Sequence, residues 1–296
     1  MNVSVIIPIY NAEKYLNDFF DYISKNDFID GDEVLLVDNG STDNSKKMCL
    51  DMCKKNPGLF NYLLYTEKAS SYSARNYGVK KSKNSILIFT DSDTKPCKNW
   101  IKCIRENTKE NQIIAGKIVL EVINGDLWEV FDKIAHLNSE ETFKNHSVAT
   151  ANMSVLKKDF IKVGEFEDRF SGGDYEWSQR ANKKGFNIVF LEKALVYHPT
   201  RKSFDAILKK EQRIAYGQGN HHANNKKRMI SLIIKFFLKI FKIDTNIRYS
   251  RQLKKEGIST KNIILFNLYF FKIRLGQLKY AIKGYKKENV RTLGLK

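Results

Sequence analysis

The first third of the chain alternates between short apolar runs and longer segments in which apolar residues recur every three or four positions. The apolar runs are bounded by turn-forming residues and predict strands at Val3–Ile9, Glu33–Val37, Phe60–Tyr65 and Ser85–Thr90. The periodic segments predict helices at Glu13–Lys25 and Ser73–Lys81. They also predict a helix that is capped by Ser41 or Asp43 and runs to about Lys55. Strands that alternate with helices imply right-handed βαβ units, so we expect an α/β fold with a doubly wound, mostly parallel sheet.

The alternation is looser after residue 93. We expect helices at Trp100–Lys109, Asp126–Glu141 and Glu176–Lys184, and strands at Ile113–Val122, Ala149–Leu156, Asn187–Leu191 and Ala194–Tyr197. Beyond residue 200 the patterns are helical only, although Tyr216–His222, with two glycines, predicts a loop. The chain is therefore expected to hold one domain over residues 1–200 and a helical region over residues 201–296.

Charge is distributed unevenly between these two parts. Residues 201–296 hold 24 Lys+Arg and 5 Asp+Glu, whereas residues 1–200 hold 27 and 28. Such asymmetry indicates an anionic partner, either a lipid surface or nucleic acid. The four cysteines lack metal-site spacing, the N-terminus is already a strand, and no stretch of about 18 apolar residues occurs, so we expect a cytoplasmic protein with reduced thiols and no membrane-spanning helix.

Asp91 and Asp93 follow an apolar strand directly, one residue apart. Ligands of open α/β sheets bind at the carboxyl ends of strands, and carboxylate oxygens there can hold Mg²⁺ or Mn²⁺ against a diphosphate. The pair therefore favours a metal-dependent enzyme that acts on a nucleotide-activated substrate. Taken alone, the same triplet also fits a solvated turn.

Several motifs occur in order and make residues 3–200 resemble the family 2 glycosyltransferases, which have the GT-A fold. They are the opening strand Val3–Asn11, the run Val37–Asp43, Ser73–Gly78, Asp91–Asp93, Gly172–Arg180 and Val196–Pro199. The resemblance implies that a sugar moves with inversion from a nucleotide-diphosphate sugar to an acceptor hydroxyl. Residues 1–95 would form the nucleotide-sugar-binding half and residues 96–200 the acceptor half. UDP is the expected nucleotide, by its frequency in the family.

The resemblance implies that the loop after the first strand holds the nucleotide base, which makes Pro8, Ile9 and Tyr10 donor-binding candidates. An aromatic ring at a strand end can stack on uracil, but Tyr10 can equally be a core residue. Asp38 would read the base or ribose together with Asn39, which stands where the family has a second aspartate. The structural alternative for this run is a helix-capping turn.

The resemblance places Arg75 near the donor diphosphate, where a guanidinium group suits phosphate oxygens. The alternative for Arg75 is an exposed helix arginine. Asp91 and Ser92 would contact the donor, Asp91 through the ribose or a metal-bound water. Asp93 would bind the cation, Mn²⁺ or Mg²⁺, and His198 would complete the metal shell; a lone histidine is otherwise usually structural.

The family's catalytic base aligns with Asp174, at the start of a predicted helix, and Gly173 stands where the family has a glutamate. Glu176 is the second candidate acid. Residues two apart do not share a helix face, so Asp174 is the better base. A simple helix cap is the structural alternative and is compatible with catalysis.

The basic C-terminal region contains two amphipathic stretches, residues 228–243 and Ile263–Ile282. Basic amphipathic helices are typical of proteins that lie on membranes, so we expect contact with an anionic membrane surface and a peripheral position on its inner face. The alternative is that these faces pack on the catalytic domain or on a second copy of the chain. The expected acceptor is a cell-envelope or lipid-linked glycan.

Two further interpretations remain for the whole chain, a nucleic-acid-binding protein and a non-catalytic scaffold. The aromatic residues of the C-terminal region lie within apolar runs, whereas a stacking platform for nucleic acid would alternate them with cations. We therefore expect no nucleic-acid partner. The complete set of acids, Asp91, Asp93 and Asp174, argues against a scaffold.

Overall fold

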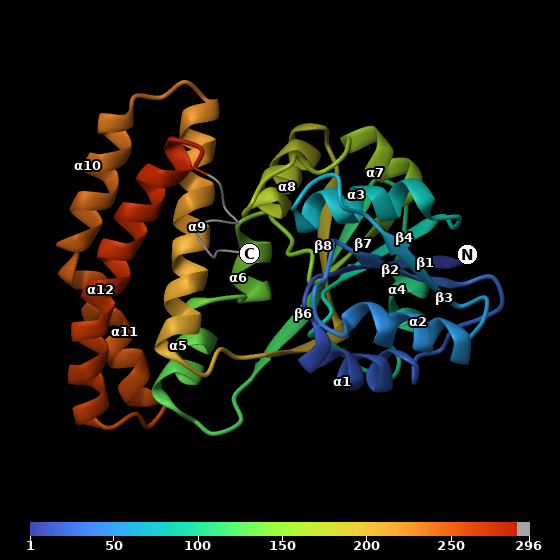
Figure 1. Ribbon diagram of the computed structural model, residues 1–296, viewed down its shortest axis with the longest axis horizontal. Coiled ribbons are helices and arrows are strands. Elements are labelled where there is room, and N and C mark those ends of the chain that lie inside the picture. The colour runs from blue at the N-terminus through green and yellow to red at the C-terminus, as the bar shows by residue number, and fades with distance from the viewer. Residues whose placement is uncertain (289–296) are drawn as a thin grey trace. The chain divides into compact units, whose positions relative to one another are not determined.

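The computed structural model describes residues 1–288 and divides into two compact units (Figure 1). The first unit contains residues 1–120, 137–168 and 173–199, and the second contains residues 121–136, 169–172 and 200–296 as far as they are described. The second unit thus joins the predicted C-terminal helical region to two short segments from the middle of the chain.

The first unit is built on an eight-stranded sheet with the order β3-β2-β1-β4-β7-β6-β8-β5. Strands β1 to β4 pair in parallel, whereas β7 pairs antiparallel with β4 and with β6, and β5 pairs antiparallel with β8. The strands are β1 Val3–Ile9, β2 Glu33–Asp38, β3 Phe60–Leu64, β4 Ile86–Thr90, β5 Lys95–Pro96, β6 Gln112–Glu121, β7 Asn152–Leu156 and β8 Asn187–Pro199.

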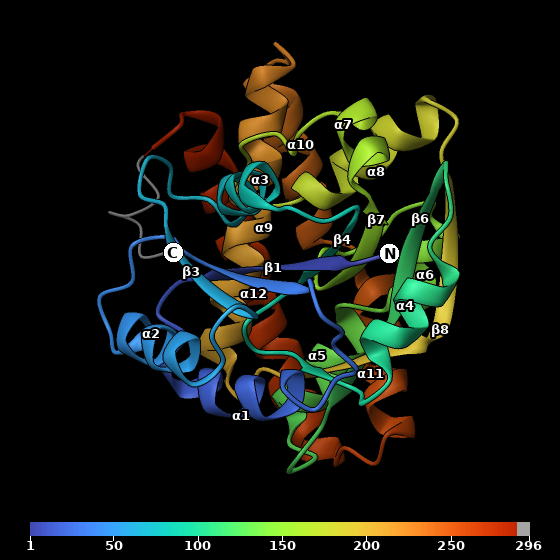
Figure 2. The same ribbon diagram turned by 90° about the vertical axis from the view of Figure 1, so that its right-hand side faces the viewer.

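Helices cover both faces of this sheet (Figure 2). One apolar core packs the sheet against α1 Glu13–Ile23, α2 Ser45–Lys55 and α4 Trp100–Asn107, and the other packs it against α3 Ser71–Lys81, α7 Lys157–Val163 and α8 Gly173–Lys183. Alternate residues of one strand enter opposite cores, as Val5 and Ile6 of β1 do. The central strands are buried on both faces, which explains their continuous apolar sequence. The predicted α/β architecture is confirmed.

The predicted helix Asp126–Glu141 is two helices, α5 Leu127–Ala135 in the second unit and α6 Ser139–Lys144 in the first. Between them Leu137 adopts a positive φ of 46°, and the Asn138 side chain caps α6 by accepting a hydrogen bond from the Glu141 amide. The two predicted strands after residue 187 are one strand, β8, which carries an exposed Glu192-Lys193 pair in its middle.

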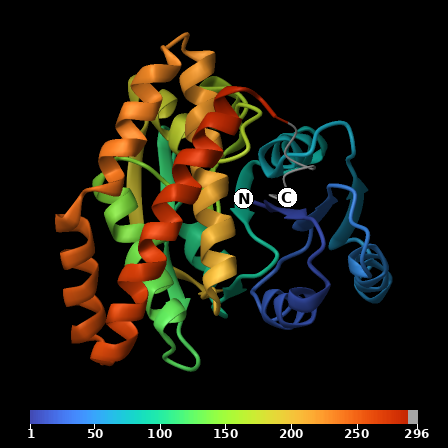
Figure 3. The same ribbon diagram turned by 60° about the vertical axis from the view of Figure 1, so that its left-hand side comes forward.

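The second unit consists of α5 and four further helices, α9 Phe204–Asn224, α10 Met229–Ile240, α11 Ile243–Lys255 and α12 Thr260–Tyr285. Figure 3 shows α9 and α12 side by side. The predicted loop at Tyr216–His222 is wrong, because this segment lies within α9. Its glycine has a packing role: a Cβ atom on Gly219 would lie 1.9 Å from the Ala281 carbonyl oxygen of α12. Within residues 1–288, no helix has the length and apolar character needed to cross a membrane.

Candidate active site

The Asp91–Asp93 segment forms a turn at the carboxyl end of β4. The Thr94 hydroxyl donates to the Asp91 carbonyl at 2.8 Å and lies 2.8 Å from the Thr90 hydroxyl, which closes the turn from beneath. Thr90 and Thr94 are fully buried, so the turn is anchored in the core while Asp91 and Asp93 remain partly exposed. The aspartates are therefore presented on a fixed support at the edge of the sheet where ligands of α/β folds bind.

Strand β5 brings His198 to this turn. It begins directly after Thr94 and pairs antiparallel with β8, with Lys95 opposite Tyr197. One step further along this ladder places His198 beside the aspartate turn, and its Nε2 atom lies 3.5 Å from an Asp93 carboxylate oxygen. Asp91, Asp93 and His198 each offer a ligand atom, and these atoms all lie within 4.8 Å of one another.

The surroundings of His198 suit a metal ligand. Its Nδ1 atom lies 2.9 Å from the Pro199 carbonyl oxygen, which can only accept, so Nδ1 carries the proton. Nε2 is therefore the ring nitrogen that can bind a cation, and it faces the Asp93 carboxylate. Two carboxylates and one imidazole are ligands that Mn²⁺ accepts readily, and Mg²⁺ takes the oxygens.

Arg75 lies against the same turn. It is 3% exposed, and its Nη2 atom forms an ion pair with Asp91. Burial raises the pKa of Asp91; Arg75 opposes this effect and Asp93 adds to it. Among the residues that the structure describes, the Arg75 Nε atom has no hydrogen-bond partner. A buried guanidinium group with an unused donor beside this turn is suited to bind phosphate oxygens.

Tyr72 connects Arg75 to Asp174. The Arg75 guanidinium lies 5.8 Å from the centre of the Tyr72 ring, and the Tyr72 hydroxyl donates to Asp174 at 3.0 Å. Burial and the Asp174 carboxylate raise the pKa of Tyr72, so the hydroxyl keeps its proton and remains a donor. Sequence reasoning missed Tyr72. No local pattern signals it, because its partner Asp174 is distant in the chain. In the structure Gly173 makes room for the Tyr72 ring, since a Cβ atom there would lie 2.8 Å from the ring.

Asp174 lies in the first turn of α8, near the start of β7. Its carboxylate accepts from the Tyr175 amide at 2.9 Å and makes a longer contact of 3.5 Å with the Thr150 amide. Because Thr90 of β4 pairs with Asn152 of the antiparallel β7, this contact places Asp174 at the same edge of the sheet as the aspartate turn. Glu176 instead binds Arg180, with Nε–Oε1 and Nη2–Oε2 distances of 2.6 and 3.1 Å.

The predicted base-binding residues lie at the ends of β1 and β2. Ile9 is fully buried in the core, Pro8 is half-buried, and Tyr10 is 36% exposed. Of these, Tyr10 presents the most accessible side chain for stacking. Ser92 is half-buried in the aspartate turn.

Asp38 and Asn39 are both engaged within the protein. Asp38 is 1% exposed and accepts from the Ser41 amide, the Ser41 hydroxyl and the Tyr62 hydroxyl, each at 2.8 Å. The Asn39 amide group donates to the carbonyl oxygens of Tyr65 and Lys68. These bonds fix the loop after β2, so a nucleotide contact from Asp38 would have to compete with them. Of the two predicted caps, Ser41 lies four residues before α2, whereas Asp43 accepts a hydrogen bond from the amide of Ser45, the first residue of α2.

Comparison with known proteins identifies the family of this chain. A family model described as Glycosyl transferase family 2 matches residues 4–164. Glycosyltransferase AglE of Haloferax volcanii is 31% identical over 222 residues, which cover 73% of this chain and 72% of AglE. The chain belongs to glycosyl transferase family 2, and it is a glycosyltransferase.

Further relatives are more distant. The poly(ribitol-phosphate) β-N-acetylglucosaminyltransferase TarS of Staphylococcus aureus is 24% identical over 68% of this chain and 36% of TarS. Among solved structures, the mannosyltransferase PcManGT from Pyrobaculum calidifontis, in complex with GDP-Man and Mn²⁺, has a TM-score of 0.60 and 14% identity over 97% of this chain and 88% of its own. TarS residues 1–349 with UDP-GlcNAc has a TM-score of 0.54 and 16% identity, covering 99% and 92%. These likenesses show the shared fold.

Proposed function

We propose that the protein transfers a sugar, with inversion, from a nucleotide-diphosphate sugar to a hydroxyl group of an acceptor. The observation that carries this proposal is the continuous set Asp93–His198–Asp91–Arg75–Tyr72–Asp174, which joins a cation site, a phosphate-binding arginine and a carboxylate at one edge of the sheet. The solved neighbours with GDP-Man and with UDP-GlcNAc support a nucleotide-sugar donor, and a UDP-sugar is our first choice.

On the donor side, Asp93, Asp91 and His198 would hold Mn²⁺ or Mg²⁺, and the bound cation would supply positive charge to stabilise the leaving diphosphate. Arg75 orients Asp91 through their ion pair and offers its remaining N–H groups to phosphate oxygens. Tyr10 provides a ring for the nucleotide base at the end of β1. These residues bind and orient the donor before any bond breaks.

On the acceptor side, Asp174 is the general base that takes the proton from the attacking hydroxyl. The Tyr72 hydroxyl and the Tyr175 amide both donate to Asp174 Oδ1, which leaves Oδ2, with only the long Thr150 contact, as the oxygen available to the acceptor. Glu176 is a weaker candidate, because Arg180 occupies both of its carboxylate oxygens.

For the acceptor we propose a cell-envelope or lipid-linked glycan, presented at the inner face of a membrane where the basic second unit docks. The name of TarS gives poly(ribitol-phosphate) as the polymer on which that relative acts, which supports a polymeric acceptor with free hydroxyl groups. A nucleic-acid-binding role for the basic region is the alternative, and binding of RNA in place of anionic vesicles would favour it.

The test of the base is Asp174→Asn, compared with Glu176→Gln as the matched control. Release of nucleoside diphosphate from UDP-, GDP- and dTDP-sugars, with water as the acceptor, should fall roughly 10²–10⁴-fold in Asp174→Asn. Donor binding, measured by calorimetry, should be unchanged in that variant. Turnover retained by Asp174→Asn and lost by Glu176→Gln would transfer the role to Glu176.

A further inference from the structure

Two helices of the second unit expose rows of large apolar side chains. On α10 and just beyond its end, residues spaced by three or four positions are 50–64% exposed: Ile230, Ile234, Phe237, Leu238 and Phe241. On α12 an equivalent row is 44–65% exposed: Ile264, Leu268, Phe271 and Leu275. Such spacing places each row on one face of its helix. We refer to the two rows together as the apolar stripe.

The apolar stripe is not the face that holds the second unit together. Leu232 and Phe236 of α10, and Phe266, Phe270 and Ile273 of α12, lie on the other side of their helices and are at most 4% exposed. They form the cores of the helical unit. Each helix therefore has a packed apolar face and a second, exposed apolar face, which folding of the unit does not require.

All charged side chains of α10 and α12 are positively charged. Neither α10 nor α12 contains an aspartate or a glutamate. Lys235 and Lys242 are exposed on and beside α10, and Lys261, Lys272 and Lys279 are exposed on α12. Long lysine stems can lie along an apolar boundary while the ammonium group reaches the polar layer above it. This combination suits the interface of an anionic bilayer.

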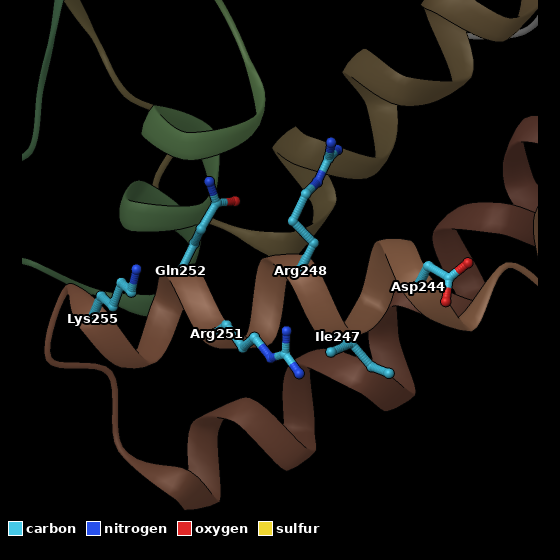
Figure 4. A pocket seen from close by; sticks show the side chains of 6 residues that line it. All are labelled: Asp244, Ile247, Arg248, Arg251, Gln252 and Lys255. Carbon is cyan, nitrogen blue, oxygen red and sulfur yellow. The ribbon is translucent and has the colours of Figure 1, made fainter.

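Helix α11, which follows α10 and packs against α12, adds a basic groove of about 400 Å³ (Figure 4). Its lining includes three exposed cations, Arg248, Arg251 and Lys255, and one acid, Asp244. Ile247 lies in the same lining and is 43% exposed, so the groove also has an apolar wall. Arginine forks match phosphate oxygens, the anionic groups that phospholipids carry at the bilayer surface.

We propose that α10, α11 and α12 dock on an anionic phospholipid bilayer, with the apolar stripe entering the boundary between headgroups and acyl chains and the α11 groove binding lipid phosphates. This inference rests on the membrane position given in the proposed function and specifies the surface that makes the contact. RNA would satisfy the cations but leave the apolar stripe in water. A second copy would bring together two regions that each hold 24 Lys+Arg against 5 Asp+Glu.

The test is co-sedimentation of the full chain with vesicles of phosphatidylglycerol and phosphatidylcholine, or of phosphatidylcholine alone, in about 0.1 M and about 0.5 M salt. The stripe variant is Ile234→Ser with Leu238→Ser, and its control is Ile29→Ser with Ile161→Ser, which are equally exposed in the first unit. The groove variant is Arg248→Gln with Arg251→Gln, and its control is Lys102→Gln with Lys109→Gln, both exposed.

We expect binding to the anionic vesicles only, weakened by salt. The stripe variant should lose roughly 10-fold or more of this binding and the groove variant roughly 30-fold, with both controls unchanged. Equal binding to neutral vesicles, or full binding by both variants, would overturn the proposal. Two other results would also overturn it, each in the absence of vesicle binding. In the first, the wild type sediments as a dimer and the stripe variant as a monomer. In the second, the wild type binds RNA and the groove variant does not.

The same preparations separate this inference from the proposed reaction. Stripe and groove variants should retain metal-dependent hydrolysis of the nucleotide sugar, because their substitutions lie outside the catalytic set. Normal vesicle binding without hydrolysis in the wild type would contradict only the proposed reaction. Normal hydrolysis without vesicle binding would contradict only the docking surface.

Discussion

Among single residues, Tyr72 is the site residue that the sequence analysis did not identify. It lies between the donor-side arginine, Arg75, and the proposed base, Asp174. Its ring packs over Gly173, and its hydroxyl fixes one oxygen of the base. We therefore propose that Tyr72 is a positioning residue, which would act on the reaction through Asp174.

Tyr72→Phe keeps the ring and removes only the hydrogen bond to Asp174. A hydrogen bond to a charged group stabilises it appreciably, so we expect kcat for donor turnover to fall roughly 10-fold while the KM of the donor stays the same. Steady-state kinetics of Tyr72→Phe and of Tyr77→Phe, a control on the same helix whose ring stacks on Tyr65, check this. Equal kcat values in the two variants would show that the hydrogen bond has no part in positioning the base.

The site residues differ in how well sequence could predict them. Asp91, Asp93 and His198 belong to local motifs, and the structure brings all three together. Tyr72 belongs to no motif, because its partner lies about a hundred positions away in the chain. Asp38 looks available in the sequence, whereas in the structure Ser41 and Tyr62 already donate to it. A side chain's availability depends on distant partners, and local pattern does not contain them.

At the level of elements, the packing of α9 against α12 depends on two glycines. A Cβ atom on Gly219 of α9 would lie 1.9 Å from the Ala281 carbonyl oxygen, and one on Gly284 of α12 would lie 2.1 Å from that of Tyr216. Both contacts are with backbone atoms, which cannot rotate away. The backbones of α9 and α12 can approach this closely only where the side chain is a hydrogen atom.

Gly219→Ala and Gly284→Ala should each lower the free energy of unfolding by about 1–3 kcal/mol, because the helices must separate. Gly276→Ala is the control, since the three atoms nearest to its Cβ atom would be side-chain atoms of Leu208 and Gln212, the nearest at 3.0 Å. There we expect a change within about 1 kcal/mol, because the helix propensity of alanine offsets the crowding. Urea unfolding of the three variants measures the difference, and similar losses in all three would contradict the close-approach explanation.

The same glycines explain why the sequence misled at α9. Glycines followed by polar residues normally predict a loop, and here they permit close helix packing. Strands β1, β2 and β4 were predictable because burial on both faces makes each one a short continuous apolar run. The end of α5 could not be predicted from local sequence, because His136, which ends this helix, contacts Glu211, a residue 75 positions away.

At the scale of the whole molecule, an ionic cluster buried in the second unit couples stability to pH. Asp132 is fully buried and accepts from His136 Nδ1 at 2.6 Å and from the Arg201 amide at 2.9 Å, and its Oδ1 atom lies 3.5 Å from Lys210 Nζ. Among the described residues Lys210 Nζ has no hydrogen-bond partner. Burial, together with Arg201 and Arg213, lowers the pKa of Lys210 to about 7, against the opposing effects of Asp132 and Glu211.

Unfolding returns Lys210 to water, where its pKa is about 10.4, so the unfolded chain binds more protons above neutral pH. Stability should therefore rise with pH, on the order of 2 kcal/mol between about pH 7 and about pH 9. Lys210→Met should lack this rise, whereas Lys209→Met, on an exposed neighbour, should keep it. Urea unfolding at the two pH values checks the prediction, and a rise of equal size in Lys210→Met would contradict it.

We propose that Asp93 and His198 hold a divalent cation against the diphosphate of a nucleotide sugar. The most direct measurement is binding and hydrolysis of UDP-, GDP- and dTDP-sugars with Mn²⁺, with Mg²⁺ and with EDTA, for the wild type beside Asp93→Ala and His198→Ala. We predict that one nucleotide class stabilises the wild type against heat and is hydrolysed, and that EDTA or either substitution abolishes both effects. A nucleotide-sugar response that survives EDTA and both substitutions would contradict the account.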